Sequence, residues 1–400
     1  MTPPVVRPDD PLLADEAARW ASAYVHVPFC ARRCPYCDFA VVVDGEPGAD
    51  AGTDAYVEAV VAEIAMERPW GPLHAIAFGG GTPSRLSAVA LGRIVGALRR
   101  RFGVVDGVEV AIEVNPEDWT DRFAAELLDA GFDRVSFGVQ SFDAHTLAWL
   151  GRVHDPHQAE AAVVSARHAG FRSVGIDLIY GTPGEDLDRW VTTVRRALAL
   201  DLDHLSAYAL TVERGTALSR SILAGAPAPD PDQQADAYEA IGELAVAAGL
   251  VRYEVSNWAR PGHHSRYNLA TWGGAEFVAF GAGAHDHRDG VRARNVRRLD
   301  VYLDRVASGV RPRAGSERLD RAAADVERLV LGLRRVAGVR RDDLVERLVV
   351  DPAGRRLVAA GVLRVGPDRL VVERPLVTDE VSRAVLALVD RDPSVSGDDC

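Results

Sequence analysis

The chain has 400 residues, which exceeds the usual size of one hydrophobic core, so one large domain and one smaller domain are expected. Its formal net charge of -12 argues against broad, non-specific binding to nucleic acid. The sequence has no apolar run of the roughly 18 residues that a membrane span needs, and its first residues lack the pattern of a signal peptide, which predicts a cytoplasmic protein.

Short β-rich runs alternate with helical stretches through the middle of the chain. The predicted strands are residues 23–29, 74–80, 107–116, 134–141, 173–181 and 204–212, and the predicted helices are 54–67, 86–101, 120–130, 157–169, 186–199 and 232–249. Because such a repeat favours right-handed crossovers, it predicts an α/β fold with a parallel sheet. With a further strand at 252–259, the sheet is expected to form a full or partial TIM-like barrel, with a doubly wound open sheet as the alternative.

The pattern changes after about residue 315. Helical stretches at 321–339 and 341–349 precede a hairpin at 363–373 and a helix at 378–389, an order that resembles a winged-helix unit. The charges of this part are nearly balanced, which disfavours DNA binding. The predicted organisation is an N-terminal extension (1–20), a barrel (21–300), a winged-helix-like domain (301–390) and a disordered tail (391–400), in which Cys400 is an exposed bystander.

Three of the four cysteines lie in the run "CARRCPYCDFA", as Cys30, Cys34 and Cys37. Three thiols cannot form an even set of disulfides, which favours a metal or redox role. A structural zinc site needs four ligands, and His26 is a candidate for the fourth. An iron–sulfur cluster is the alternative, since closely spaced thiolates hold such clusters. A cubane held by three cysteines leaves one iron open, and an α-amino acid can chelate that iron through its amine and carboxylate.

Polar and glycine-rich segments follow five of the predicted strands. The cysteines come after the first strand, and Gly79-Gly80-Gly81-Thr82 after the second. Glu113 and Gln140 end the third and fourth strands, and Asp177 lies in the fifth. Because the carboxyl ends of parallel strands meet at one edge, where α/β folds build their sites, these residues are expected to lie together.

The cysteine spacing is that of the radical S-adenosylmethionine (SAM) superfamily, and further motifs make the resemblance closer. The segments "YVHVPFCARRCPYCDF", "FGGGTPS", "EVNPE", "RVSFGVQSF", "LGRVHD", "DLIYGTPGE" and "YEVSNWA" occur in the expected order. Over roughly residues 20–375 the chain resembles oxygen-independent coproporphyrinogen III oxidases and, more closely, HemW-type haem chaperones.

This resemblance implies two cofactors and their sites. Cys30, Cys34 and Cys37 would bind a [4Fe-4S] cluster whose open iron chelates SAM. The residues that match SAM-contacting positions are Tyr24, Gly80, Gly81, Thr82, Glu113, Gln140, Arg152 and Asp177, with looser matches at Thr211 and Ala284. In an active radical enzyme, reduction of the cluster would cleave SAM to a 5'-deoxyadenosyl radical. In the chaperone branch the output is haem transfer to an acceptor protein, and no catalytic residue is assigned.

Two positions help to distinguish the haem-chaperone branch from the oxidase branch. Phe39 stands where the oxidases carry a further cysteine, which favours the chaperones. In the chaperone motif His-Asn-x-x-Tyr-Trp, however, Tyr267 replaces the histidine and Thr271 the tyrosine, and histidine is the usual ligand of haem iron. Four histidines are alternative ligands: His263, His264, His285 and His287. The competing functions are a radical enzyme acting on another substrate, such as a methylase or cyclopropane-forming relative, and third, a coproporphyrinogen dehydrogenase.

Overall fold

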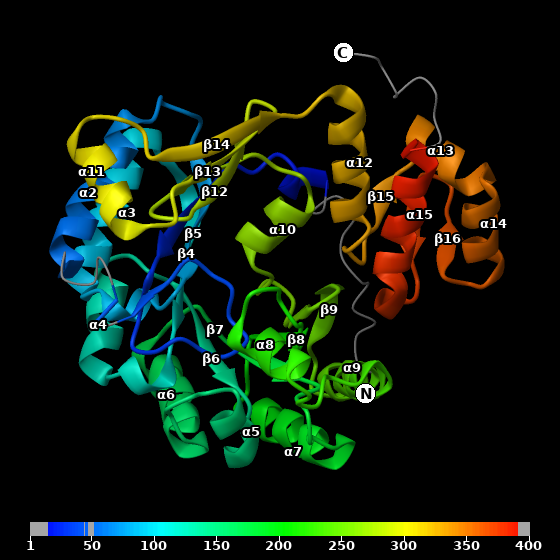
Figure 1. Cartoon of the computed structure of the whole chain (residues 1–400), viewed down its shortest axis with the longest axis horizontal. Helices are drawn as coiled ribbons and strands as arrows, with labels where there is room; N and C mark the ends of the chain where they lie inside the picture. The colour runs from blue at the N-terminus through cyan, green and yellow to red at the C-terminus, as the bar shows by residue number, and fades with distance from the viewer. Residues whose placement is uncertain (1–14, 44, 47–51, 391–400) are drawn as a thin grey trace.

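The computed structural model describes residues 15–43, 45–46 and 52–390 (Figure 1). The predicted tail with Cys400 and most of the predicted N-terminal extension lie outside these residues. The described end of the extension packs on the barrel, because Ala17 and Trp20 are buried together with Tyr253, Ala259 and Leu269.

The centre of the fold is a 12-stranded sheet in the order β14-β13-β12-β11-β1-β4-β5-β6-β7-β8-β10-β9. Its parallel strands are β11 (Phe277–Phe280), β1 (Ser22–Val27), β4 (Leu73–Gly80), β5 (Val104–Val114), β6 (Arg134–Gln140), β7 (Ser173–Tyr180) and β8 (His204–Ala209). All six strands predicted for the repeat are confirmed. The order from β1 to β8 follows the chain without the reversal that defines a doubly wound sheet, so the fold is a partial TIM-like barrel.

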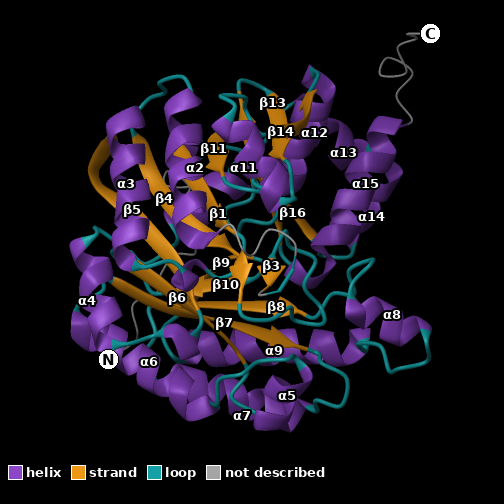
Figure 2. Cartoon of the chain, turned by 60° about the vertical axis from the view of Figure 1, so that its left-hand side comes forward, coloured by secondary structure: helices purple, strands orange, loops and turns teal. Residues whose placement is uncertain are grey.

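Helices cover the outer face of this curved sheet, as Figures 1 and 2 show. They include α2 (Gly52–Met66), α3 (Ala88–Phe102), α4 (Asp121–Asp129), α6 (Pro156–Ala169), α7 (Leu187–Leu198) and α9 (Pro231–Ala247), all six of which were predicted. In α7 the Asp186 side chain caps the first turn by accepting from the Arg189 N–H, and Trp190, Val194 and Ala197 are buried at helical spacing. The sequence pattern therefore identifies which face of each helix packs on the barrel.

Three sequence expectations need correction at the two edges of the sheet. Residues 252–259 form a hairpin, β9 (Val251–Glu254) and β10 (Asn257–Ala259), that is antiparallel to β8. The sequence missed β11 and the antiparallel strands β12 (His285–Arg288), β13 (Val291–Asn295) and β14 (Arg313–Arg318), which are short or flanked by glycines. Helix α11 (Leu299–Ala307) packs on α2, so the barrel part continues to Arg318 rather than ending at residue 300.

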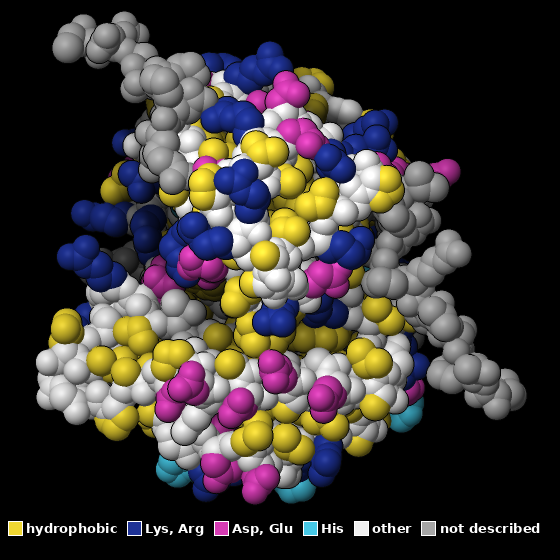
Figure 3. Space-filling view, turned by 90° about the vertical axis from the view of Figure 1, so that its right-hand side faces the viewer, with side chains coloured by type: hydrophobic (Ala, Val, Ile, Leu, Met, Phe, Trp, Pro, Cys, Tyr) yellow, Lys and Arg dark blue, Asp and Glu magenta, His cyan; other side chains and the backbone are white. Residues whose placement is uncertain are grey.

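The remaining residues form a smaller unit with its own core. Its elements are α12 (Arg321–Gly332), β15 (Val339–Arg340), α13 (Asp343–Val350), α14 (Pro352–Ala359), β16 (Leu363–Val365), β17 (Arg369–Val372) and α15 (Thr378–Asp390). This order of helices followed by a hairpin is the winged-helix-like order expected from the sequence. Leu329, Val345, Leu370 and Val385 are fully buried in its core. On the face shown in Figure 3, arginine and acidic side chains are interspersed with apolar ones.

Contacts around β9 join this unit to the barrel. The Val336 N–H donates to the Tyr253 carbonyl at 3.0 Å, and the Arg334 guanidinium lies over the Trp272 ring, 4.3 Å from its centroid. Trp272 ends α10 (Arg266–Trp272), the helix that carries the altered haem-chaperone motif. None of the helices in the described part of the chain has both the length and the apolar character that crossing a membrane requires.

Candidate functional site

The cysteines lie on a loop that is closed at its base by a short pair of parallel strands. Strand β2 (Phe29–Cys30) pairs with β3 (Val42–Val43). Beneath the loop, the buried His26 ring donates from Nε2 to the Ala40 carbonyl, with 2.8 Å between the two atoms. These bonds hold the loop over the carboxyl ends of the barrel strands.

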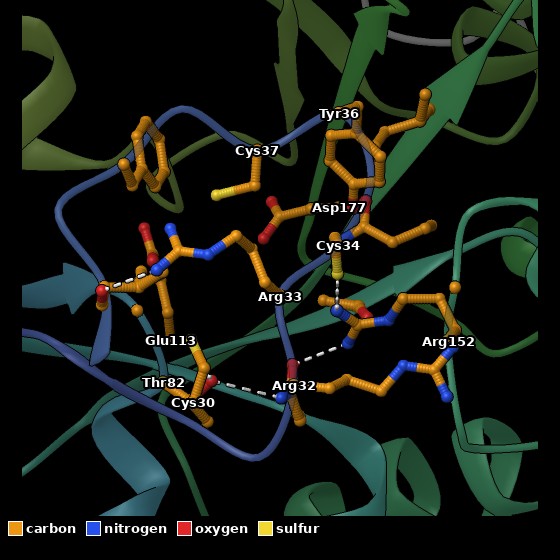
Figure 4. A pocket seen from close by; sticks show the side chains of 18 of the residues that line it. Cys30, Arg32, Arg33, Cys34, Tyr36, Cys37, Thr82, Glu113, Arg152 and Asp177 are labelled. Carbon is orange, nitrogen blue, oxygen red and sulfur yellow. Dashed lines mark hydrogen bonds between the residues drawn. The ribbon is translucent and has the colours of Figure 1, made fainter. Parts of the chain in front are cut away.

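A cavity of about 530 Å³ separates this loop from the strand ends. Of the residues proposed from the sequence, Cys30, Cys34, Cys37, Gly80, Gly81, Thr82, Glu113, Gln140, Arg152 and Asp177 all line it, and Thr211 does too. Figure 4 shows the labelled members of this set around one space. The expectation that the carboxyl edge gathers these side chains is therefore confirmed.

Tyr24 and Ala284 are not among the lining residues. The Tyr24 ring stacks on Tyr267, with 5.8 Å between the ring centroids. Ala284 is buried. Tyr24 was expected to contact SAM, but it lies in the middle of β1, deeper in the barrel than the strand ends. In this structure its ring packs against Tyr267.

Polar side chains from the barrel contact two of the three thiols. The Thr82 hydroxyl donates to Cys30 Sγ at 3.5 Å, and Arg152 Nη1 lies 4.0 Å from Cys34 Sγ (Figure 4). Arg152 Nη2 also donates to Asn115 Oδ1 and to the Gly138 carbonyl, at 2.5 and 2.8 Å. A buried guanidinium fixed beside a thiol suits a site in which bound thiolates carry negative charge.

The arrangement of donors fits an iron–sulfur cluster better than a zinc ion. His26, the candidate fourth zinc ligand, donates its Nε2 proton to Ala40 and turns Nδ1 toward Gly80. In the described ranges, no three His, Cys, Asp or Glu side chains are grouped tightly enough to hold a single ion. A cubane binds each thiolate through a different iron atom, so it needs three thiols around a cavity rather than three at one point.

The glycine segment after β4 allows the backbone to lie against neighbouring groups. Gly80 has a φ of 106°, and a Cβ added there would lie 2.4 Å from His26 Nδ1. At Gly81 an added Cβ would lie 2.8 Å from the Pro28 carbonyl oxygen. Glycine is therefore required here, because a side chain would push on the histidine and the strand that support the cysteine loop.

Two carboxyl groups, Glu113 and Asp177, face the cavity from β5 and β7. The barrel walls surround both groups, and only their cavity side is accessible. Burial, and after it the nearby Asp177, raise the pKa of Glu113 to about 8, although a hydrogen bond from the Gly80 N–H opposes the shift. Burial likewise raises the pKa of Asp177, which accepts from the Ser136 hydroxyl at 3.1 Å. A bound cationic group such as an amine or a sulfonium would favour the ionised form of this pair, because an opposite charge nearby lowers the pKa of a carboxyl group.

Replacing Glu113 with glutamine is expected to stabilise the protein at pH 8.5 and to have little effect at pH 5. A carboxyl whose pKa is raised on folding costs stability as the pH rises from its unfolded value toward about 8. We expect a gain of about 1 kcal/mol at the higher pH, discounted because the carboxyl faces an open cavity. Thermal unfolding of both proteins at the two pH values measures this. An equal difference at both values would contradict the assignment.

Some cavity residues were missed by the sequence reasoning. Gln140, which was predicted, has a φ of 67° at the end of β6, a conformation that residues with a side chain rarely adopt. Asn115, Tyr36 and Tyr208 also line the cavity. Asn115 follows Glu113 by two residues, and its place at the strand end was the available signal. Tyr208 is 44% exposed, and that surface faces the cavity.

The residues of the altered haem-chaperone motif are not among those that line the cavity. Tyr267 is enclosed between Tyr24 and the edge of the Phe277 ring, with ring centroids 5.8 and 6.1 Å away. Asn268 Nδ2 donates to the Tyr253 hydroxyl at 3.3 Å. The ring of Tyr267, which is partly buried, therefore packs inside the barrel, and Trp272 at the end of the same helix contacts the C-terminal unit.

Comparisons with known proteins show the family of the chain. The family model of the Radical SAM superfamily matches residues 24–197. The Heme chaperone HemW of Mycobacterium tuberculosis is 38% identical over 384 residues, which is 94% of this chain and 97% of that protein. The Heme chaperone HemW of Bacillus subtilis is 34% identical, over 82% of this chain and 86% of that protein.

The fold has a counterpart among solved structures. Coproporphyrinogen III oxidase (HemN) from Escherichia coli, described as a radical SAM enzyme, superposes with a TM-score of 0.78. The match covers 93% of this chain and 92% of that one at 22% identity, which shows a shared fold and leaves the activity open.

Proposed function

The chain belongs to the HemW haem-chaperone family of the radical SAM superfamily, and from this premise we propose that it binds haem and delivers it to an acceptor protein. The family implies a [4Fe-4S] cluster and SAM. The observation that carries the proposal is the cavity at the carboxyl edge of the barrel, where three thiols face a glycine segment and two carboxyl groups. This set of donors fits both cofactors.

Each part of the cavity has a proposed role. Cys30, Cys34 and Cys37 hold the cluster, and Arg152 offsets its negative charge. The residues proposed to contact SAM are Gly80, Gly81, Thr82, Glu113, Gln140 and Asp177. The Gly80–Gly81 backbone can approach the amino-acid portion closely, and Glu113 with Asp177 can accept hydrogen bonds from its cationic groups and ionise beside them. When bound and reduced, such a cluster supplies one-electron chemistry to SAM.

Phe39 separates this proposal from the oxidase alternative. It lies two residues after Cys37, lines the cavity and is 56% exposed. A phenylalanine there provides apolar surface and no further thiol, so the cysteine loop holds one cluster and presents an aromatic side chain beside it. The proposed acceptor protein and the cytoplasmic location rest on the family and the sequence.

Anaerobic titration of the reconstituted protein with haem tests the proposal. We expect saturable binding near one haem per chain, followed by visible difference spectra, and loss of that signal when an apoprotein that accepts haem is added. Absence of saturable binding would overturn the chaperone proposal.

A radical enzyme acting on another substrate is the second candidate, and Tyr267 favours it, because the histidine of the haem-chaperone motif is replaced and the tyrosine ring packs against two other rings. The cavity also has room beside the cysteines for a small molecule. Steady accumulation of 5'-deoxyadenosine with SAM and dithionite, in a protein that does not bind haem, would support this alternative.

A further inference from the structure

If the chain binds haem, as proposed above, the iron needs a ligand in place of the missing motif histidine, and the four candidate histidines differ in their positions. His263 and His264 lie at the amino end of the barrel, where Arg134, the first residue of β6, donates to the His264 carbonyl at 3.1 Å. His264 packs against the edge of the Tyr253 ring, 5.0 Å between centroids. Both residues are therefore at the end of the barrel opposite the cysteine loop.

His285 and His287 lie on one face of β12, at the other edge of the sheet. His287 is opposite Arg292 on β13, and Arg292 forms an ion pair with Glu327 of α12. His285 is opposite Arg294. Unlike His287, which is partly buried, His285 and Arg294 are both exposed. Of the two histidines on β12, His285 is therefore the one that a ligand from solution can reach.

The segment that leads into β12 contacts the cysteine loop directly. A Cβ added at Gly283 would lie 2.4 Å from the Ala40 Cβ, so the two backbones pack closely there. Arg297 Nη2 donates to the Asp38 carbonyl. These contacts place the residues on either side of the β12–β13 hairpin against residues 38 and 40, which flank the exposed Phe39.

The electrostatic surroundings connect the same groups. Although the His285 ring is exposed, partial desolvation by its neighbours and the charges of Arg294 and Arg297 lower its pKa, which favours the neutral imidazole. His285 and Arg297 in turn lower the pKa of His26 beneath the cysteine loop, which places all three groups within a short distance. A neutral imidazole has a free nitrogen lone pair for a metal.

We propose that Phe39, His285, Arg294 and Arg297 form a haem site beside the cysteine loop, in which an imidazole nitrogen of His285 binds the iron. The bond forms by donation of a nitrogen lone pair and needs no change in oxidation state. The exposed Phe39 ring would provide apolar surface for the porphyrin, and the guanidinium groups of Arg294 and Arg297 would pair with its two propionates. Haem combines these features, an apolar ring, a metal centre and two carboxylates, in one molecule.

Haem titration of His285→Ala tests the site. We expect at least about a tenfold loss of affinity and loss of the histidine-ligated spectrum, with restoration of that spectrum by free imidazole. Arg294→Gln combined with Arg297→Gln is expected to weaken binding while keeping the spectrum, because the iron ligand remains.

His168→Ala is the matched control, since His168 is an exposed histidine on α6, and it is expected to bind haem as the wild type does. Wild-type affinity and spectrum in His285→Ala, or loss in His287→Ala alone, would overturn the site and leave haem binding itself intact. Failure of the wild-type protein to bind haem would instead overturn the proposed function.

Discussion

Replacing Cys34 with alanine is expected to give a folded protein that holds no [4Fe-4S] cluster after reconstitution. Cys34 lies on a loop rather than in the core, so its loss is expected to change the free energy of unfolding by about 1 kcal/mol or less. The cluster, in contrast, depends on three thiolates, and two cannot hold a cubane in the proposed site. Iron and sulfide analysis of the purified protein, together with thermal unfolding, measures both effects.

Cys400→Ala is the matched control for this experiment. Cys400 lies outside the described residues and outside the cysteine motif, so its replacement is expected to leave the iron and sulfide content unchanged. Wild-type amounts of iron and sulfide in Cys34→Ala would contradict the cluster assignment. Loss of the cluster in both variants would show that the effect is not specific to the loop.

Replacing Gly80 with alanine is expected to destabilise the protein by about 2–4 kcal/mol and to reduce its cluster content. The new methyl group would lie 2.4 Å from His26 Nδ1, and the backbone there has a φ of 106°. His26 is buried and bonded to Ala40, so moving its ring disturbs the base of the cysteine loop. Thermal unfolding and iron content measure the two consequences.

Gly184→Ala separates backbone strain from the clash with His26. Gly184 also has a positive φ, 85°, but an added Cβ would meet no atom within 4 Å. It is expected to cost about 1–2 kcal/mol, the cost of a left-handed conformation alone, and to retain the cluster. If the two alanine variants were equally stable and equally rich in iron, the proposed support of the loop by His26 would be wrong.

The parts of the barrel that the sequence predicted are those with strong local patterns. Strands such as β7 are long, nearly continuous apolar runs, and helices such as α7 carry buried residues at helical spacing with a capping aspartate. That the cysteine segment and the acids at strand ends lie close together then follows from the topology, because parallel strands end at one edge of the sheet.

The missed parts depend on tertiary contacts. Strand β11 has four residues between glycine-containing segments, and its pairing with β1 cannot be read from so short a run. The position of Tyr24 was inferred from a motif, yet the ring stacks on Tyr267, which is 243 residues later in the chain (267 − 24). The β12 segment beside Phe39 is likewise a contact between residues far apart in sequence.

The most direct test of the account is electron paramagnetic resonance of the reduced, reconstituted protein with and without SAM. The account holds that three cysteines bind a cluster with one open iron and that the adjoining cavity binds SAM. It therefore predicts a [4Fe-4S] signal that shifts when SAM is added and does not shift in a protein with the cavity altered at Glu113 and Asp177. A cluster signal that is the same with and without SAM would contradict the central claim.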